Sequence, residues 1–262
     1  MEAEDQPQTV SNIAVFDAEK QRSVPFDGRF FKPNVLVDAP NPEMPLLDAI
    51  HTRRSSRSYS TKPVDRATFD WLVSNAMHAP TACNEQQWKI IHIDDPGMIE
   101  ELYWRGSAAF LRNTRQCFLV CYNRRTDNRH WHDHIQSGAA FITTFQLLAH
   151  SIGIGSCWIG HLPSKGEVSR LFGIHRAYEP VALVSYGYYR GKIKVQPRKH
   201  EATRIVMDNQ FQTEGLQFDS ATKYIFRTVA RWMYYRIPPM LRRRIRSLTF
   251  PYEKKFYYET FD

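Results

Sequence analysis

Three arginines and four hydroxyl side chains crowd into seven residues near the start of the patterned part of the chain. The run is Arg-Arg-Ser-Ser-Arg-Ser-Tyr at 53–59, and it follows the apolar stretch 46–50. Guanidinium groups bind phosphate oxygens in pairs, and serine hydroxyls add short hydrogen bonds to the same anion. Arginine is also favoured at exposed helix ends by the helix dipole. The run therefore predicts either an anion site or a solvated helix end.

A second polar segment, residues 79–88, lies between an expected helix and an expected strand. It contains Asn84, Gln86 and Gln87. Amide side chains present a donor beside an acceptor, which suits the edge of a planar heterocycle. The alternative is a polar turn in which Asn84 bonds to nearby backbone.

A third segment, residues 153–160, carries Gly153, Gly155 and Gly160 around Cys-Trp-Ile. Glycines let backbone amides approach a ligand closely. The alternative is a helix C-cap followed by a strand. The spacing differs from the Gly-x-Gly-x-x-Gly motif, and the segment follows a helix where that motif follows a strand, so we expect no dinucleotide fold.

Hydrophobic periodicity predicts alternating helices and strands that position these three segments. We expect Asp65 to cap one helix, Asp133 to cap the longest helix, and Ser164 with Glu167 to form a capping box. The pattern indicates an α+β fold with helices on both faces of a sheet. Two of the expected helices start near Pro45 and Asp65, one or two short ones lie within 97–112, and two more span about 133–151 and 164–172. The expected strands are 88–93, 116–121, 157–159 and 181–186.

The charge of the chain is concentrated at its C-terminal end. The whole chain carries +8, whereas residues 220–262 hold ten Lys and Arg against three Asp and Glu, or +7, which leaves 25 against 24, or +1, in the other 219 residues. The chain has no run of 18 or more consecutive apolar residues, so we expect no transmembrane span, and its acidic start is unlike a signal peptide. Four cysteines, with Cys117 and Cys121 on one face of a strand, predict buried free thiols and a cytoplasmic location.

Taken together and in this order, the three segments resemble the nitroreductase family of flavoproteins. The similar region runs over about 45–206 and includes the Ala-Leu-Val-Ser-Tyr-Gly-Tyr run at 182–188 and Pro-Arg-Lys at 197–199. We therefore expect an extended N-terminal arm over 1–44, the family domain over 45–206, and a basic, aromatic extension over 207–262. The resemblance implies a three-layer α+β fold with a mainly antiparallel sheet and an intertwined homodimer.

The resemblance also implies that FMN binds across the subunit interface. Arg53, Ser55 and Arg57, with a lesser part for Arg54, would hold its phosphate and ribityl chain, and Arg198 would complete the clamp. Asn84 would bind the isoalloxazine edge.

In the same resemblance, Gln86 would brace the loop of Asn84. The segment along the flavin face would comprise Cys157, Trp158, Ile159 and Gly160, with a backbone amide near Gly160 or His161 approaching N5. No catalytic side chain is expected because the flavin carries the hydride chemistry.

The implied activity is hydride transfer through flavin N5 from NADH or NADPH to a small, planar organic acceptor. Tyr103, Trp104 and Phe110 are the candidate substrate contacts, with helix packing as their alternative role. A flavin-dependent dehydrogenase or oxidase that needs no NAD(P)H, and a non-catalytic flavin-binding protein anchored by its basic tail, stay open as alternatives. Gln87 stands where the family usually has proline, which either loosens the loop or adds a donor.

Two further segments carry weaker signals. His130 and His134 have the spacing of a metal pair but lack a third ligand, so we expect a helix start and no metal. Residues 219–250 interleave apolar, aromatic and basic residues at helical spacing. This pattern favours burial against a partner subunit, then peripheral contact with the inner membrane surface, and least of all nucleic acid.

Overall fold

The computed structural model describes residues 16–17, 22–23, 44–125, 128, 130–190, 205–213, 220–238 and 240–245. The chain forms two compact units, 1–38 and 39–262. In the first unit, β1 (Phe16–Asp17) pairs with β2 (Arg22–Ser23) in antiparallel fashion. These two strands lie within the segment that the sequence predicts as an arm.

The second unit is built on a sheet of four antiparallel strands in the order β3-β4-β6-β5. The strands are β3 (Trp88–Ile93), β4 (Gln116–Asn123), β5 (Ile154–Ile159) and β6 (Tyr178–Tyr188). Leu119 of β4 pairs with Leu183 of β6, and Trp158 of β5 pairs with Val184 on its other side. The central strand β4 is buried on both faces, which explains its nearly continuous apolar sequence.

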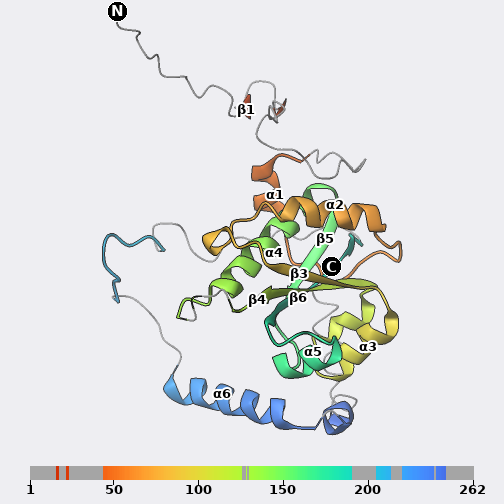
Figure 1. Cartoon of the computed structure of the whole chain (residues 1–262), viewed down its shortest axis with the longest axis vertical. Coiled ribbons are helices and arrows are strands. Elements are labelled where there is room, and N and C mark those ends of the chain that lie inside the picture. Colours follow the sequence, from red (N-terminus) through yellow and green to blue (C-terminus); the bar gives the residue numbers. More distant parts are fainter. Residues whose placement is uncertain are drawn as a thin grey trace, which may run out of the picture. The chain divides into compact units, whose positions relative to one another are not determined.

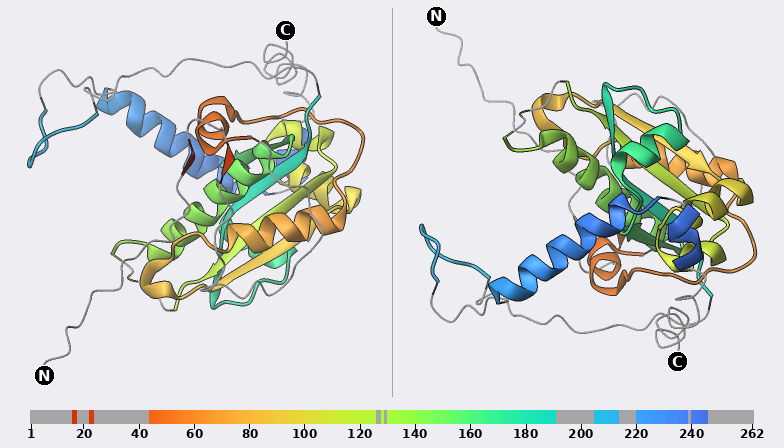
Figure 2. Two further views of the ribbon diagram at one scale, coloured as in Figure 1. Left: turned by 90° about the horizontal axis from the view of Figure 1, so that it is seen from above. Right: turned by 90° about the horizontal axis from the view of Figure 1, so that it is seen from below.

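Helices cover both faces of this sheet (Figure 1). One face packs against α2 (Arg66–Ala76) and α4 (Asp133–Ser151), and α1 (Leu46–Thr52) lies against α4. The other face packs against α3 (Pro96–Trp104), the 3₁₀ turn η2 (Ala109–Asn113) and α5 (Lys165–Leu171). Figure 2 shows the two helical layers from above and below. The expected three-layer fold with an antiparallel sheet is confirmed.

Local signals place several helix boundaries correctly. Asp65 accepts a hydrogen bond from the Thr68 amide at 2.8 Å, and Ser164 with Glu167 forms the predicted capping box. The long helix α4 has the predicted bounds, but Asp133 is its first helical residue, so the predicted Asp133 cap is wrong. His132 occupies the capping position in the left-handed conformation and makes no side-chain cap bond.

Three strands are longer than the sequence predicts, and one of them, β4, continues to Asn123. β5 begins at Ile154 because Gly155 belongs to the strand and not to a helix end. A side chain at Gly155 would lie 2.7 Å from the Tyr189 ring and 2.9 Å from Ser56 Cβ, so the close approach of these neighbours requires glycine there. β6 starts at Tyr178 because the register shift between Val120 and Cys121 of β4 accommodates Pro180 in the ladder.

The predicted buried thiols are confirmed. Cys117 and Cys121 are free, buried and on the same face of β4. Burial raises the pKa of the Cys121 thiol to about 12, so it is un-ionised at neutral pH. After residues 205–213, the described chain resumes in α6 (Ala221–Arg236), which is capped by Ser220. No helix among the described residues is long and apolar enough to cross a membrane.

Candidate functional site

The arginine run leaves the end of α1 and lies in extended form along the edge of β5. Ser55 bridges to Ser156, and the Ser56 amide donates to the Ser156 carbonyl at 3.0 Å. In extended backbone, side chains alternate between two sides. Ser56 is buried, whereas Ser55 and Arg57 are exposed. The backbone therefore presents a guanidinium and a hydroxyl outward on one side of the strand edge.

The charged side chains along this edge of β5 affect the pKa of Cys157. Burial raises the pKa of its thiol, while the positive charges of Arg57 and Arg53 and a hydrogen bond with Ser55 oppose that rise. Arg53, Ser55 and Arg57 thus all act on the neighbourhood of Cys157. The structure brings together the first and third polar segments of the sequence.

Arg54 has a different role from its neighbours. Its Nη1 donates to the carbonyls of His51 at 2.7 Å and Arg53 at 2.6 Å. A cation bonded to the last carbonyls of a helix stabilises that end. The helix-end interpretation therefore describes Arg54, and the outward-facing residues of the run are the candidates for an anion site.

The end of β5 leads into the second part of the site. Ile159 is buried in the core and Trp158 is about one-third exposed, at 37%. A side chain added at Gly160 would find nothing within 4 Å, so open space lies beside this backbone. The His161 carbonyl accepts a hydrogen bond from the Ala108 amide at 3.0 Å, which ties residues 160–161 to the start of η2.

The three aromatic candidates for substrate contact lie in different environments. Phe110 is buried, with the Arg57 guanidinium 5.9 Å from its ring centroid. Tyr103 is fully buried in the layer of α3. Trp104 is half-buried, donates to Glu100 at 3.0 Å, and lies 4.8 Å from the Arg243 guanidinium. Phe110 is the aromatic candidate that the structure brings to the arginine row.

The amide loop forms a separate, strained group. Cys83, Asn84 and Gln86 all have positive φ angles of 49–55°, a conformation that costs about 1–3 kcal/mol for each residue that is not glycine. Gln86 Nε2 donates to Asn84 Oδ1 at 2.7 Å, so its side chain holds that of Asn84. Strain of this kind concentrates at ligand sites.

Gln87, which stands where proline is usual, ties this loop to the sheet. Its side chain donates to Glu85 at 2.9 Å and accepts from Asn123 Nδ2 at 2.5 Å. The backbone amide of Asn123 also donates to the backbone carbonyl of Gln87 at 3.3 Å. Side-chain bonds therefore fix the loop in the absence of the proline ring.

The arginine row and the amide loop lie near opposite ends of α4. Thr52 Oγ1 lies 2.8 Å from His150 Nε2 near the C-terminal end, whereas the Ala82 amide donates to Ser137 Oγ at 3.2 Å near the N-terminal end. Thirteen residues of helix separate Ser137 from His150, or about 20 Å at 1.5 Å per residue. The two groups are therefore held to α4 at well-separated points.

A polar chain that the sequence does not predict adjoins the start of the arginine row. The Thr52 hydroxyl donates to the Asp48 carbonyl, so it accepts from His150 Nε2, and His150 Nδ1 accepts from the Tyr189 hydroxyl at 2.7 Å. Burial and the charges of Arg53 and Arg54 lower the pKa of His150, which keeps it neutral. The residues of this polar chain lie far apart in sequence, so no local sequence pattern predicts it.

Arg198 and the histidine pair at 130 and 134 are the remaining predicted features. Arg198 lies outside the described residues. His134 is buried and lies 3.5 Å from Glu179, which also pairs with Lys165. Among the residues that the structure describes, no group of three or more His, Cys, Asp or Glu could hold a metal ion.

Comparison with known proteins identifies the family. Residues 50–105 and 98–188, together more than half of the chain, match the model of the nitroreductase family. The chain belongs to the nitroreductase family. The matched region contains the arginine row, the amide loop and the whole four-stranded sheet, and it lies within the predicted 45–206 domain.

Curated and structural relatives agree with this membership. A protein of Methanothermobacter thermautotrophicus named for NADH dehydrogenase/NAD(P)H nitroreductase is 27% identical over 183 residues, which are 68% of this chain and 90% of the relative. A similarly named protein of Archaeoglobus fulgidus is 31% identical over 54% of this chain and 84% of its own. An FMN-dependent nitroreductase from Clostridium difficile shares the fold, with a TM-score of 0.55, 23% identity, and coverage of 63% of this chain and 99% of that one.

Proposed function

We propose that this nitroreductase-family protein is an FMN-dependent oxidoreductase that takes electrons from NADH or NADPH and reduces a small, planar organic acceptor. The observation that carries the proposal is the outward-facing row of Arg53, Ser55 and Arg57 fixed against β5 beside Cys157. The names of the curated relatives support the nicotinamide donor, and the name of the C. difficile structure supports FMN.

The residues present suit a flavin mononucleotide. A phosphate dianion is costly to bury unless several charge-assisted hydrogen bonds compensate, and Arg53, Ser55 and Arg57 can supply them. The space beside Gly160 is open, and we propose that the flat ring lies there, along residues 157–160. Arg198, from the segment outside the described residues, is proposed to complete the phosphate clamp.

The site needs two protomers. Asn84, held by Gln86, suits the polar edge of the isoalloxazine ring, but the contacts that hold its loop and the start of the arginine row to α4 lie about 20 Å apart along that helix. We therefore propose a homodimer in which the Asn84 loop of one protomer completes the site formed by the arginine row of the other. Two equivalent sites per dimer follow from the two-fold symmetry.

When bound, FMN supplies the hydride chemistry of the reaction. The backbone amides of Gly160 and His161 are proposed to donate to the ring edge, where negative charge develops on reduction. Fixed donors of this kind lower the cost of that charge. Arg57, whose guanidinium lies against the Phe110 ring, would orient the phosphate end of FMN. Phe110 would border the site on the side of Arg57. No side chain of the chain is required to act as acid, base or nucleophile.

The test is direct reduction of the reconstituted protein. NADH or NADPH should bleach the flavin absorbance, and a quinone or nitroaromatic should restore it. If neither nucleotide bleaches a bound flavin that dithionite does reduce, the donor is wrong and a dehydrogenase, an oxidase or a non-catalytic flavin protein is the better description. A cytoplasmic location stays a prediction.

A further inference from the structure

The helix α6 lies outside the family match, which ends at residue 188, and it carries two unlike faces. Five large apolar side chains recur at helical spacing on one side and are 46–74% exposed. They are Ile225, Phe226, Val229, Trp232 and Met233. Lys223 and Arg227, which are both exposed, lie four residues apart on the opposite side of the helix.

The helix contacts the family domain through its polar side. Tyr234 falls on the side of Lys223 and Arg227, and it is half-buried. Its hydroxyl lies 2.6 Å from the position of an added side chain at Gly106, and its ring centroid lies 6.2 Å from that of His161. The contact leaves the apolar side of α6 exposed and places the helix beside residues 160–161 of the candidate site.

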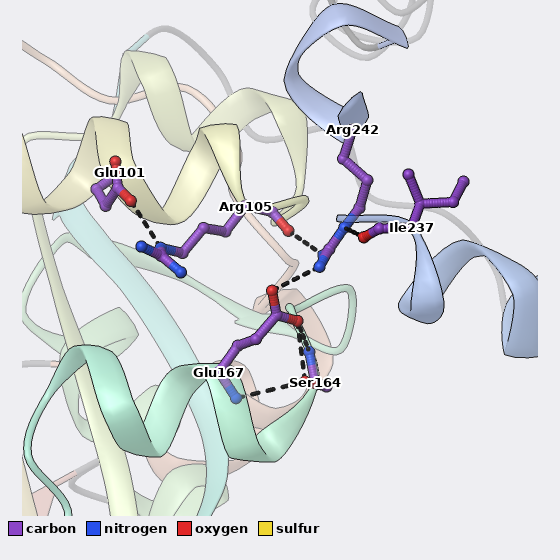
Figure 3. Close-up of polar contacts among 6 residues, drawn as sticks. All are labelled: Glu101, Arg105, Ser164, Glu167, Ile237 and Arg242. Atoms are coloured by element: carbon purple, nitrogen blue, oxygen red, sulfur yellow. Dashed lines mark hydrogen bonds and ion pairs between the residues drawn. The ribbon is translucent and has the colours of Figure 1, made fainter. Parts of the chain in front are cut away.

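A buried arginine fixes this arrangement just after α6 (Figure 3). Arg242 is 2% exposed, and its guanidinium donates to Glu167 at 2.5 Å, to the Arg105 carbonyl at 2.7 Å and to the Ile237 carbonyl at 2.8 Å. Glu167 belongs to the capping box of α5 and also accepts from Ser164. One side chain thus joins the end of α6 to both α3 and α5.

The charge of this region selects the occupant of the apolar face. Residues 220–245 contain seven Lys and Arg and no Asp or Glu. A second copy of α6 would bring like charges together, which disfavours pairing of this face with its own copy. An anionic lipid surface matches both the positive charge and the apolar stripe.

The dimensions also fit a helix that lies in the bilayer surface. Sixteen residues extend about 24 Å, which is shorter than a hydrocarbon core. Arg236 lies one turn after Trp232 on the same side of the helix, and its guanidinium is 3.7 Å from the Trp232 ring centroid, which pairs a cation with an aromatic ring at the end of the stripe. Interfacial helices combine tryptophan and phenylalanine on one face with basic residues on the other.

We propose that α6 binds the surface of an anionic lipid bilayer through Ile225, Phe226, Val229, Trp232 and Met233, with its basic residues at the headgroups. The buried Arg242–Glu167 pair keeps the family domain attached to the bound helix. Binding is peripheral and reversible, and it places the 160–161 end of the candidate site beside the lipid surface.

Co-sedimentation of the full chain with sucrose-loaded vesicles tests this proposal. The protein should pellet with vesicles of equal parts phosphatidylglycerol and phosphatidylcholine, should stay in the supernatant with phosphatidylcholine alone, and should be released by high salt. Trp232→Glu should lower the partition coefficient about tenfold or more, because it removes a large apolar group from the stripe. Tyr224→Glu is the matched control: the residue is exposed and off the stripe, and the charge change is the same.

Both variants alter exposed positions, and an unchanged unfolding midpoint will establish that the fold is intact. Equal pelleting of the two variants, or equal pelleting of the native chain with both vesicle types, would overturn the proposal. Absence of pelleting would also overturn it. If sedimentation velocity then showed that Trp232→Glu reduces self-association, a second copy of the chain would be the occupant.

Discussion

The placement of the arginine row and the amide loop at opposite ends of α4 makes a prediction about mixed dimers. A heterodimer is formed from one Arg57→Gln protomer and one Asn84→Ala protomer, each carrying a different tag. If each site draws its arginines from one protomer and its loop from the other, one site of the heterodimer is native and the other carries both defects. If each site belonged to one chain, both sites would carry a single defect.

The size of each defect follows from the bonds lost. A charge-assisted hydrogen bond contributes about 1.5–3 kcal/mol and a neutral one about 0.5–1.5 kcal/mol. The doubly defective site should therefore lose about 2–4.5 kcal/mol, a weakening of FMN binding of about 30-fold or more, while the other site keeps native affinity.

Flavin fluorescence quenching on titration of the isolated heterodimer measures both sites. The expected curve is biphasic, with one native-affinity FMN per dimer. Each homodimeric variant serves as a control and should give a single weakened phase. A heterodimer in which both sites are weakened, with no site of native affinity, would refute the shared-site reasoning.

Two further predictions concern packing and the tail. Gly155→Ala should lower the free energy of unfolding by about 1–3 kcal/mol, because the added carbon meets Tyr189 at 2.7 Å. Gly160→Ala should leave the free energy of unfolding unchanged in chemical denaturation and weaken only FMN binding. Equal losses of stability in the two variants would contradict the geometry. Glu167→Gln should increase hydrogen exchange at 237–245, because Arg242 loses its buried counter-charge, and unchanged exchange would contradict the anchoring role. Burial raises the pKa of Glu167, but the hydrogen bonds from Arg242 and Ser164 outweigh burial and lower the pKa below 4.5. The stability that ionised Glu167 contributes is therefore full above pH 4.5 and is lost as the pH falls through the lowered pKa. Glu167→Gln should lack this loss of stability at acid pH when unfolding is measured against pH.

Local chemistry was enough to predict much of this fold. The bounds of α4 follow from its apolar repeat, and the starts of α2 and α5 follow from side chains that bond to amides three residues away. The buried thiols of β4 follow from the two-residue period of a strand. Each of these signals depends on residues close together in the chain.

The misses have tertiary causes. Gly155 resembles a helix terminator in sequence, but it is needed because Ser56 and Tyr189, from distant segments of the chain, pack where a side chain would lie. The bond between Glu167 and Arg242 joins residues 75 positions apart, and no spacing rule reveals such a pair. His132 takes the left-handed cap position although Asp133 is the better capping residue in isolation.

The candidate site was predictable in parts and not as a whole. The residue types of the arginine row and the amide loop indicate an anion and a heterocycle, and the extended course of 53–57 along β5 brings two of the three segments together. The distance between the row and the loop is set by the length of α4, which is a property of the folded chain. The polar chain through His150 depends on the same tertiary placement.

The measurement that tests the central claim most directly is the flavin content and FMN affinity of the purified chain beside two matched variants. We expect a yellow protein with one FMN per protomer, an affinity lowered about tenfold or more by Arg57→Gln, and a smaller effect of Arg54→Gln, whose guanidinium bonds to the end of α1. A colourless protein that takes up no added FMN, or variants with equal affinities, would contradict the assignment of the arginine row as the phosphate site.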